Sequence, residues 1–195
     1  MNDLQWKKRI TLIASCICIS ACLQIFQAQF IYWRYSFFSE IWRWWTAHWV
    51  HVGWIHFLLN IIAFACFPFI FPHIQNRFII VLLLVLAPLC SLTFYYLYPN
   101  IEAYAGLSGI LHGLYVAAAF FYLKFRKERN FALLVLFLIM AKLAWENTFG
   151  QIGTAQLIGS PVLVEAHLVG AFWGAICAVI YLGYQQIVET NQIKD

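Results

Sequence analysis

The sequence predicts an all-α, polytopic membrane protein with six transmembrane helices. Its composition is the first observation behind this fold class. Hydrophobic residues make up 64% of the 195 residues, charged residues make up 10%, and the mean hydropathy is +0.77. Soluble domains carry roughly 25% charged residues, so the composition excludes an ordinary soluble protein.

Apolar runs are the second observation. Six of them are long enough to cross the ~30 Å hydrocarbon core of a bilayer as helices that rise ~1.5 Å per residue. The fifth is short, and an extension past Glu146 is the alternative for its end. The predicted spans are residues 10–28, 53–71, 78–98, 107–123, 131–145 and 162–184. We expect residues 1–195 to form one membrane domain.

The distribution of basic residues is the third observation and predicts the orientation. Cytoplasmic connections are rich in Lys and Arg. With a cytoplasmic N-terminus, the outer side carries only Arg34 and Arg43, while the inner side carries Lys7, Lys8, Arg9, Arg77, Lys124, Arg126, Lys127, Arg129 and Lys194. We therefore expect both termini in the cytoplasm.

The first outer connection, about residues 29–52, is unusually aromatic and has no run of spanning length. Aromatic and amphipathic segments favour the membrane interface. We expect this connection to lie there because it contains Phe30, Tyr32, Trp33, Tyr35, Phe37, Phe38, Trp42, Trp44, Trp45 and Trp49.

Three polar clusters lie near the starts of spans two, four and six. They are His56 with Asn60, Ser108, and His167. All three spans run from the outside to the inside, so these groups reach one depth near the outer leaflet. Polar residues inside a bilayer are rare without a functional reason. The agreement in depth predicts a shared site.

Ser108 is the candidate nucleophile. It lies between Gly106 and Gly109 at the start of a predicted helix, where free N–H groups and the helix dipole favour a developing oxyanion. The alternative is an ordinary helix cap, because Ser is a preferred N-cap residue.

His167 is the candidate general base. Gly170 and Gly174 follow it on the same helix face, and Gly109 and Gly113 form a similar pair on span four. Small residues let transmembrane helices approach closely, which predicts contact between His167 and Ser108. A structural hydrogen bond between helices is the alternative role.

His56 and Asn60 are four residues apart and share a helix face. Both side chains can donate hydrogen bonds to an oxyanion. The alternative is a structural pair that ties span two to its neighbours. His112 lies one turn after Ser108 and could pack beside His167, relay a proton or fill space.

The carboxylates favour a Ser–His dyad without a third member. Glu165 points about 200° away from His167 at ~100° per residue, and Glu102 lies in an outer loop. Lys142 and Glu146 are four residues apart and are expected to pair with each other. We expect no cofactor and no metal.

These motifs together resemble the rhomboid family of intramembrane serine proteases. That family has a Trp-Arg pair in the first outer loop, here Trp42-Arg43, and a His-x-x-x-Asn pair in the second span. Its Gly-x-Ser-Gly motif opens the fourth span, here at residues 106–109. Its Ala-His-x-x-Gly-x-x-x-Gly run lies in the sixth, here at residues 166–174. The resemblance implies a Ser108–His167 dyad with an oxyanion site at His56, Asn60 and Ser108.

More narrowly, the chain resembles the rhombosortase subgroup. Ordinary rhomboid proteases usually have Tyr four residues after the nucleophile, where this chain has His112, and residues 142–146 also look like that subgroup. The resemblance implies a bacterial inner membrane, a site facing the periplasm, and single-pass membrane substrates with a C-terminal Gly-Gly sorting tail. Nucleic acid is not an expected partner.

Besides a purely structural polytopic protein, two alternatives remain at this point. The first is a catalytically inactive rhomboid-like protein that binds transmembrane helices; such members lack the Ser or the His. The second is a membrane metalloprotein that uses His48, His51 and His56, although the chain has no H-E-x-x-H motif and no carboxylate nearby.

Overall fold

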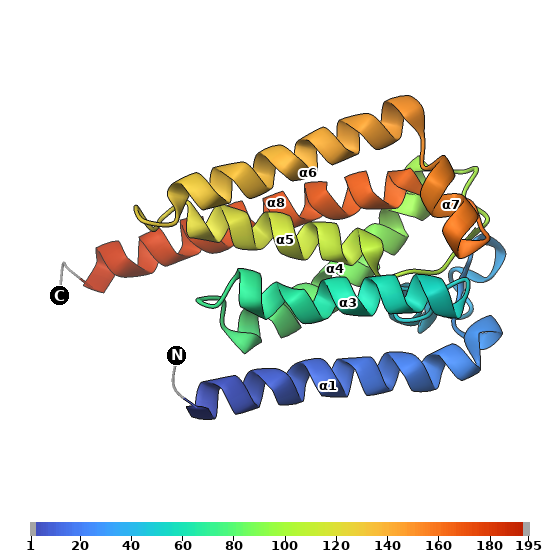
Figure 1. Ribbon diagram of the computed structural model, residues 1–195, viewed down its shortest axis with the longest axis horizontal. Helices are drawn as coiled ribbons and strands as arrows, with labels where there is room; N and C mark the ends of the chain where they lie inside the picture. The colour runs from blue at the N-terminus through green and yellow to red at the C-terminus, as the bar shows by residue number, and fades with distance from the viewer. Residues whose placement is uncertain (1–2, 193–195) are drawn as a thin grey trace.

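The structure is a computed structural model that describes residues 3–192, so Lys194 lies outside the described residues. It is mainly helical. A helix lies in each of the six regions predicted to span the membrane, which confirms that these regions are helical (Figure 1). These helices are α1 (Asp3–Ile25), α3 (Trp54–Ile70), α4 (Asn76–Leu97), α5 (Ser108–Tyr122), α6 (Arg129–Phe149) and α8 (Val164–Gln192).

The length and apolar composition of the helices are those of a polytopic membrane protein. By length and composition, α1, α4, α6 and α8 can cross a membrane, whereas α3 and α5 are shorter apolar helices. At ~1.5 Å per residue, the 15 residues of α5 extend only about 23 Å. The all-α membrane fold is confirmed, and the number of six spans stays a prediction.

Helix α5 lies at the centre of the bundle. It contacts α3, α4, α6 and α8, and its contact with α8 is the most extensive between any two helices of the described chain. Most of its side chains are buried, including three consecutive alanines at 117–119. Helices α6 and α1 lie on opposite outer sides (Figure 1). A short helix can serve here because its neighbours, rather than lipid, surround it.

The starts of α3, α5 and α8 lie at one end of the bundle. Helix α1 begins and α8 ends at the opposite end (Figure 1). The three polar clusters of the sequence are therefore at the same end of the molecule, as predicted from the direction of the spans.

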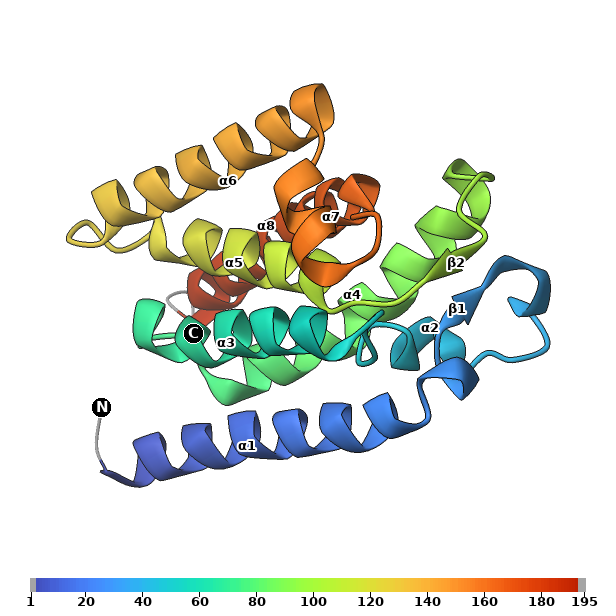
Figure 2. The same cartoon turned by 45° about the vertical axis from the view of Figure 1, so that its right-hand side comes forward.

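The connection between α1 and α3 contains short elements at this end (Figure 2). They are η1 (Gln27–Gln29), β1 (Tyr32–Trp33), η2 (Arg34–Ser36) and α2 (Arg43–Thr46). Strand β1 pairs antiparallel with β2 (Ala103–Tyr104), which precedes α5. Two-residue strands have no detectable periodicity, so the sequence did not predict this pairing.

The structure differs from the sequence prediction in two further places, both close to α6. The predicted fifth span ends at residue 145, but α6 continues to Phe149 before Gly150 ends it. A short helix, α7 (Ile152–Ile158), then precedes α8 and was not predicted. The longer α6 places Glu146 inside a helix, which matters for the site.

Candidate functional site

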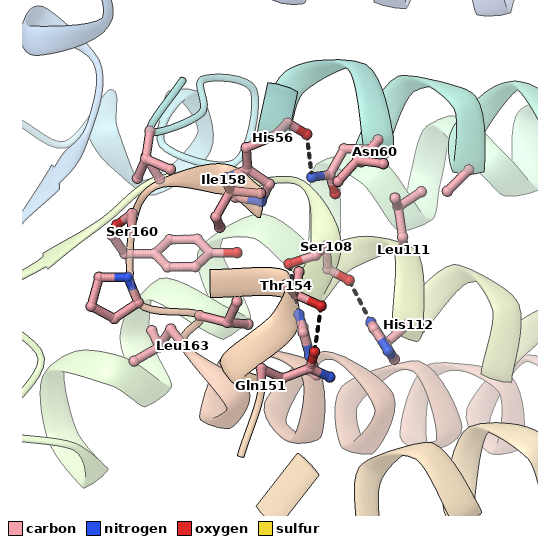
Figure 3. A pocket seen from close by; sticks show the side chains of 18 of the residues that line it. His56, Asn60, Ser108, Leu111, His112, Gln151, Thr154, Ile158, Ser160 and Leu163 are labelled. Atoms are coloured by element: carbon pink, nitrogen blue, oxygen red, sulfur yellow. Dashed lines mark hydrogen bonds between the residues drawn. The ribbon is translucent and has the colours of Figure 1, made fainter. Parts of the chain in front are cut away.

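The predicted site residues from three helices line one cavity of about 660 Å³. Ser108 is the first residue of α5, His56 and Asn60 lie in the first two turns of α3, and His167 lies in the first turn of α8. Figure 3 shows His56 and Asn60 on one side of Ser108 and His112 on another. The helix starts thus bring together groups that are far apart in the sequence.

Ser108 and His167 are in direct contact. The Ser108 Oγ lies 2.9 Å from the His167 Nε2, which is hydrogen-bond distance for a hydroxyl donor and a ring nitrogen acceptor. The exposed fraction of His167 is 5%. A serine hydroxyl bonded to a buried imidazole is the arrangement in which His can act as general base toward Ser.

The glycines explain why this contact is possible. A Cβ atom added to Gly170 would overlap the backbone carbonyl of Gly109, and one added to Gly174 would overlap the carbonyl of Gly113. Helices α5 and α8 therefore approach closely enough for backbone contact. This confirms the close approach predicted from the small-residue spacing.

Gly106 shapes the turn before the nucleophile. Its φ is +152°, which L residues with a side chain rarely adopt, and a Cβ atom there would lie 2.9 Å from the His56 Cε1. The Gly106 N–H donates to the Ala47 carbonyl at 3.0 Å, and its carbonyl accepts from the Tyr104 hydroxyl at 2.5 Å. A larger residue could not hold this approach to His56.

His112 stacks on His167. The ring centroids are 4.3 Å apart and the ring planes differ by 18°. The His112 Nδ1 lies 2.7 Å from the Ser108 carbonyl oxygen, and since a carbonyl only accepts, Nδ1 carries the proton. Of the roles considered for His112, the structure shows packing beside His167.

Asn60 and His56 each have a side-chain nitrogen that can still form a hydrogen bond. The Asn60 Nδ2 donates to the His56 backbone carbonyl at 2.9 Å, which uses one of its two protons. The His56 Nδ1 is buried and has no partner among the described residues. Both side chains line the cavity next to Ser108.

The position of Glu146 contradicts the prediction that no carboxylate contacts His167. Its Oε2 lies 2.7 Å from the His167 Nδ1, and its side chain is fully buried. The predicted pair with Lys142 is also present, on Oε1, where Gln151 binds as well. The sequence analysis was wrong to stop at that pair, because a spacing of four residues describes one helix and says nothing of contacts to another.

Trp42 and Arg43 lie in the outer connection and do not line the cavity. Arg43 is buried and donates to the Ile31 carbonyl at 2.7 Å and the Ala28 carbonyl at 3.3 Å. Its Nε binds the Glu40 Oε2 at 2.7 Å. Trp42 is about half exposed. Arg43 therefore holds the connection together and does not contact the reacting groups.

The alternative metal cluster is not assembled. His48 binds the Ser91 Oγ at 3.1 Å, whereas His51 packs edge-on against His56 with centroids 5.1 Å apart. Within residues 3–192, the group with metal-ligand proximity is instead His112, Glu146 and His167, whose ligand atoms lie within 4.8 Å. One hydrogen bond links Glu146 and His167 directly.

Comparison with known proteins places the chain in a family. No curated protein matches the sequence. The Rhomboid domain family matches residues 39–184, which is well over half of the chain and includes every residue of the cavity that was predicted from the sequence. The chain therefore belongs to the rhomboid family, whose members are generally intramembrane serine proteases.

Proposed function

We propose that this chain is an active intramembrane serine endopeptidase. The observation that carries the proposal is the 2.9 Å contact between the Ser108 Oγ and the His167 Nε2. The contact joins α5 and α8 inside a cavity that has room for a peptide segment. A rhomboid-like protein that only bound helices would have no need of this pair.

The reaction starts when the Ser108 hydroxyl attacks a peptide carbonyl and His167 takes its proton at Nε2. The resulting oxyanion accepts hydrogen bonds from the Ser108 N–H, His56 and Asn60. His167 then returns the proton to the leaving amine as the C–N bond breaks. Water, activated by the same histidine, hydrolyses the acyl-enzyme and frees Ser108.

The hydrolysis needs water at the site, and the lining of the cavity supports its entry. Polar side chains from α3, α6 and the start of α7 line it, among them Asn60, Gln151 and Thr154 (Figure 3). Such polar groups in a cavity allow water and a non-helical substrate backbone at membrane depth, where lipid would not.

We further propose a rhombosortase-type activity in a bacterial inner membrane. His112 in the position of the usual Tyr supports this narrower assignment. Basic residues in the helix ends and the connection at the end opposite the cavity support cytoplasmic termini and a periplasmic site. The substrates would be single-pass membrane proteins with a C-terminal Gly-Gly motif, a spanning segment and a short basic end, cut near the periplasmic face.

Cleavage in reconstituted vesicles tests the proposal. The full chain is combined with a single-pass reporter that carries a Gly-Gly tail, and with a matched reporter in which Leu-Leu replaces Gly-Gly. We expect the wild type to cut the first reporter, and Ser108→Ala to bind it without cutting. Cleavage by Ser108→Ala would reject the nucleophile. Equal cleavage of both reporters would reject the rhombosortase assignment alone.

A further inference from the structure

Glu146 is a buried carboxylate near the C-terminal end of α6. A charged side chain within a membrane protein is costly unless it has partners. Its two oxygens have separate partners: Oε1 accepts from the Lys142 ammonium and the Gln151 amide, and Oε2 faces the His167 Nδ1 at 2.7 Å. The two donors on Oε1 stabilise the ionised form and fix the orientation of the carboxylate.

The contact with Glu146 determines the tautomer of His167. An ionised carboxylate only accepts hydrogen bonds, so the His167 Nδ1 must carry the proton. The Nε2 is then unprotonated and can accept the proton of the Ser108 hydroxyl, 2.9 Å away. The other tautomer would present an N–H to Ser108 and could not act as a base.

We infer that Glu146 is a positioning residue that makes the site a Ser108–His167–Glu146 triad. This inference rests on the proposed function. When the proton moves from the Ser108 Oγ to the His167 Nε2, the imidazolium keeps its Nδ1 proton, and the neighbouring Glu146 carboxylate stabilises the positive charge. Glu146 itself takes no proton, as in Ser–His–Asp sites.

Other groups around His167 do not replace Glu146. His112 of α5 stacks on the ring face and bonds to a backbone carbonyl rather than to His167. Glu165 lies on the same helix as His167 but makes no hydrogen bond to it. Among the described residues, the titratable groups that interact with His167 are His56 from α3, His112 from α5, Lys142 and Glu146 from α6, and Glu165 from α8.

The reaction of Ser108 with a fluorophosphonate probe separates this role from general structural support. The full-length protein in detergent is titrated with the probe, which gives a maximal labelling rate and a half-saturating concentration. We expect Glu146→Gln to lower the maximal rate at least about 100-fold, because the amide can donate to Nδ1 and favour the wrong tautomer. The half-saturating concentration should change less than about threefold, and Glu146→Asp should recover part of the rate.

The matched control is Glu165→Gln, which removes a carboxylate two residues from His167 and should label like the wild type. A maximal rate of Glu146→Gln within threefold of wild type would overturn the inference while leaving the proposed protease intact. Failure of the wild type to label at Ser108 would instead overturn the proposed function, and the triad with it.

A measurement on the unmutated protein guards against a variant that does not fold. Nitrogen NMR of protein labelled with ¹⁵N-histidine distinguishes protonated from unprotonated ring nitrogens, and His167→Gln assigns the signal. We expect neutral His167 with the proton on Nδ1 and a strongly downfield Nδ1 proton resonance. A proton on Nε2 would overturn the inference.

Discussion

The ring of His112 lies parallel to the ring of His167 at a centroid distance of 4.3 Å. The same residue donates from Nδ1 to the backbone carbonyl of Ser108. One side chain thus contacts both members of the proposed nucleophile–base pair and restricts how far either can move.

Substitutions of His112 test the stacking contact. An aromatic stack contributes about 0.5–1.5 kcal/mol beyond its buried area, and a hydrogen bond adds about as much. We expect His112→Ala to slow labelling of Ser108 by a fluorophosphonate about tenfold, and His112→Phe, which keeps the stack, to slow it only a few-fold. Equal rates for the two variants would show that stacking plays no part.

Asn60 is expected to stabilise the oxyanion. Loss of one oxyanion donor lowers turnover by about 10²–10³-fold, so Asn60→Ala should lower the cleavage rate by at least about 100-fold with little change in KM. Asn147→Ala is the control, because Asn147 makes the same bond to a carbonyl four residues back but does not line the cavity. Similar losses in both variants would point to a structural role.

The contact between α5 and α8 should tolerate no side chain at Gly170. A methyl group there meets the backbone of Gly109, which cannot rotate away, and overpacking of this kind costs about 1–3 kcal/mol or more. We expect Gly170→Ala to lower the melting temperature in detergent by several degrees and to abolish labelling of Ser108. Gly183→Ala, in open space on the same helix, should retain both; a stable, reactive Gly170→Ala would contradict the close packing.

Acid should destabilise the outer connection through two buried histidines. Burial lowers the pKa of His48 to about 3, against an opposing hydrogen bond with the Ala87 backbone. Burial, and then the neighbouring His56, lower the pKa of His51 to about 3. Unfolded histidine has a pKa near 6.5, so the unfolded chain binds more protons between these values. Stability is full above about pH 6.5 and falls below it, by up to about 1.4 kcal/mol per pH unit for each group.

Thermal unfolding in detergent from pH 7.5 to 4.5 measures this effect. His51→Phe removes one of the two groups, and its ring nitrogens have no partners to lose among the described residues. We expect this variant to show a shallower decline with acid. His73→Gln, at an exposed position, should decline as the wild type does, and an unchanged slope in His51→Phe would contradict the assignment.

The contact between Glu146 and His167 could not be predicted from the sequence. The spacing of Lys142 and Glu146 correctly predicted their pair. That spacing holds for any helix, so it could not reveal that the second oxygen of Glu146 faces α8. A hint was available in the alternative that the fifth span continues past Glu146, which α6 does.

The sequence by itself determined which six long segments are helical and which polar groups lie at the same end of the bundle. Apolar runs, the alternating direction of spans and the glycine spacing depend only on local composition and on chain geometry, so Ser108 and His167 could be brought together without coordinates. The tertiary structure alone decided the Glu146–His167 contact, the His112 stack, the β1–β2 pairing and α7. Each depends on how helices or loops are rotated and shifted against one another, and that arrangement results from packing across the whole bundle.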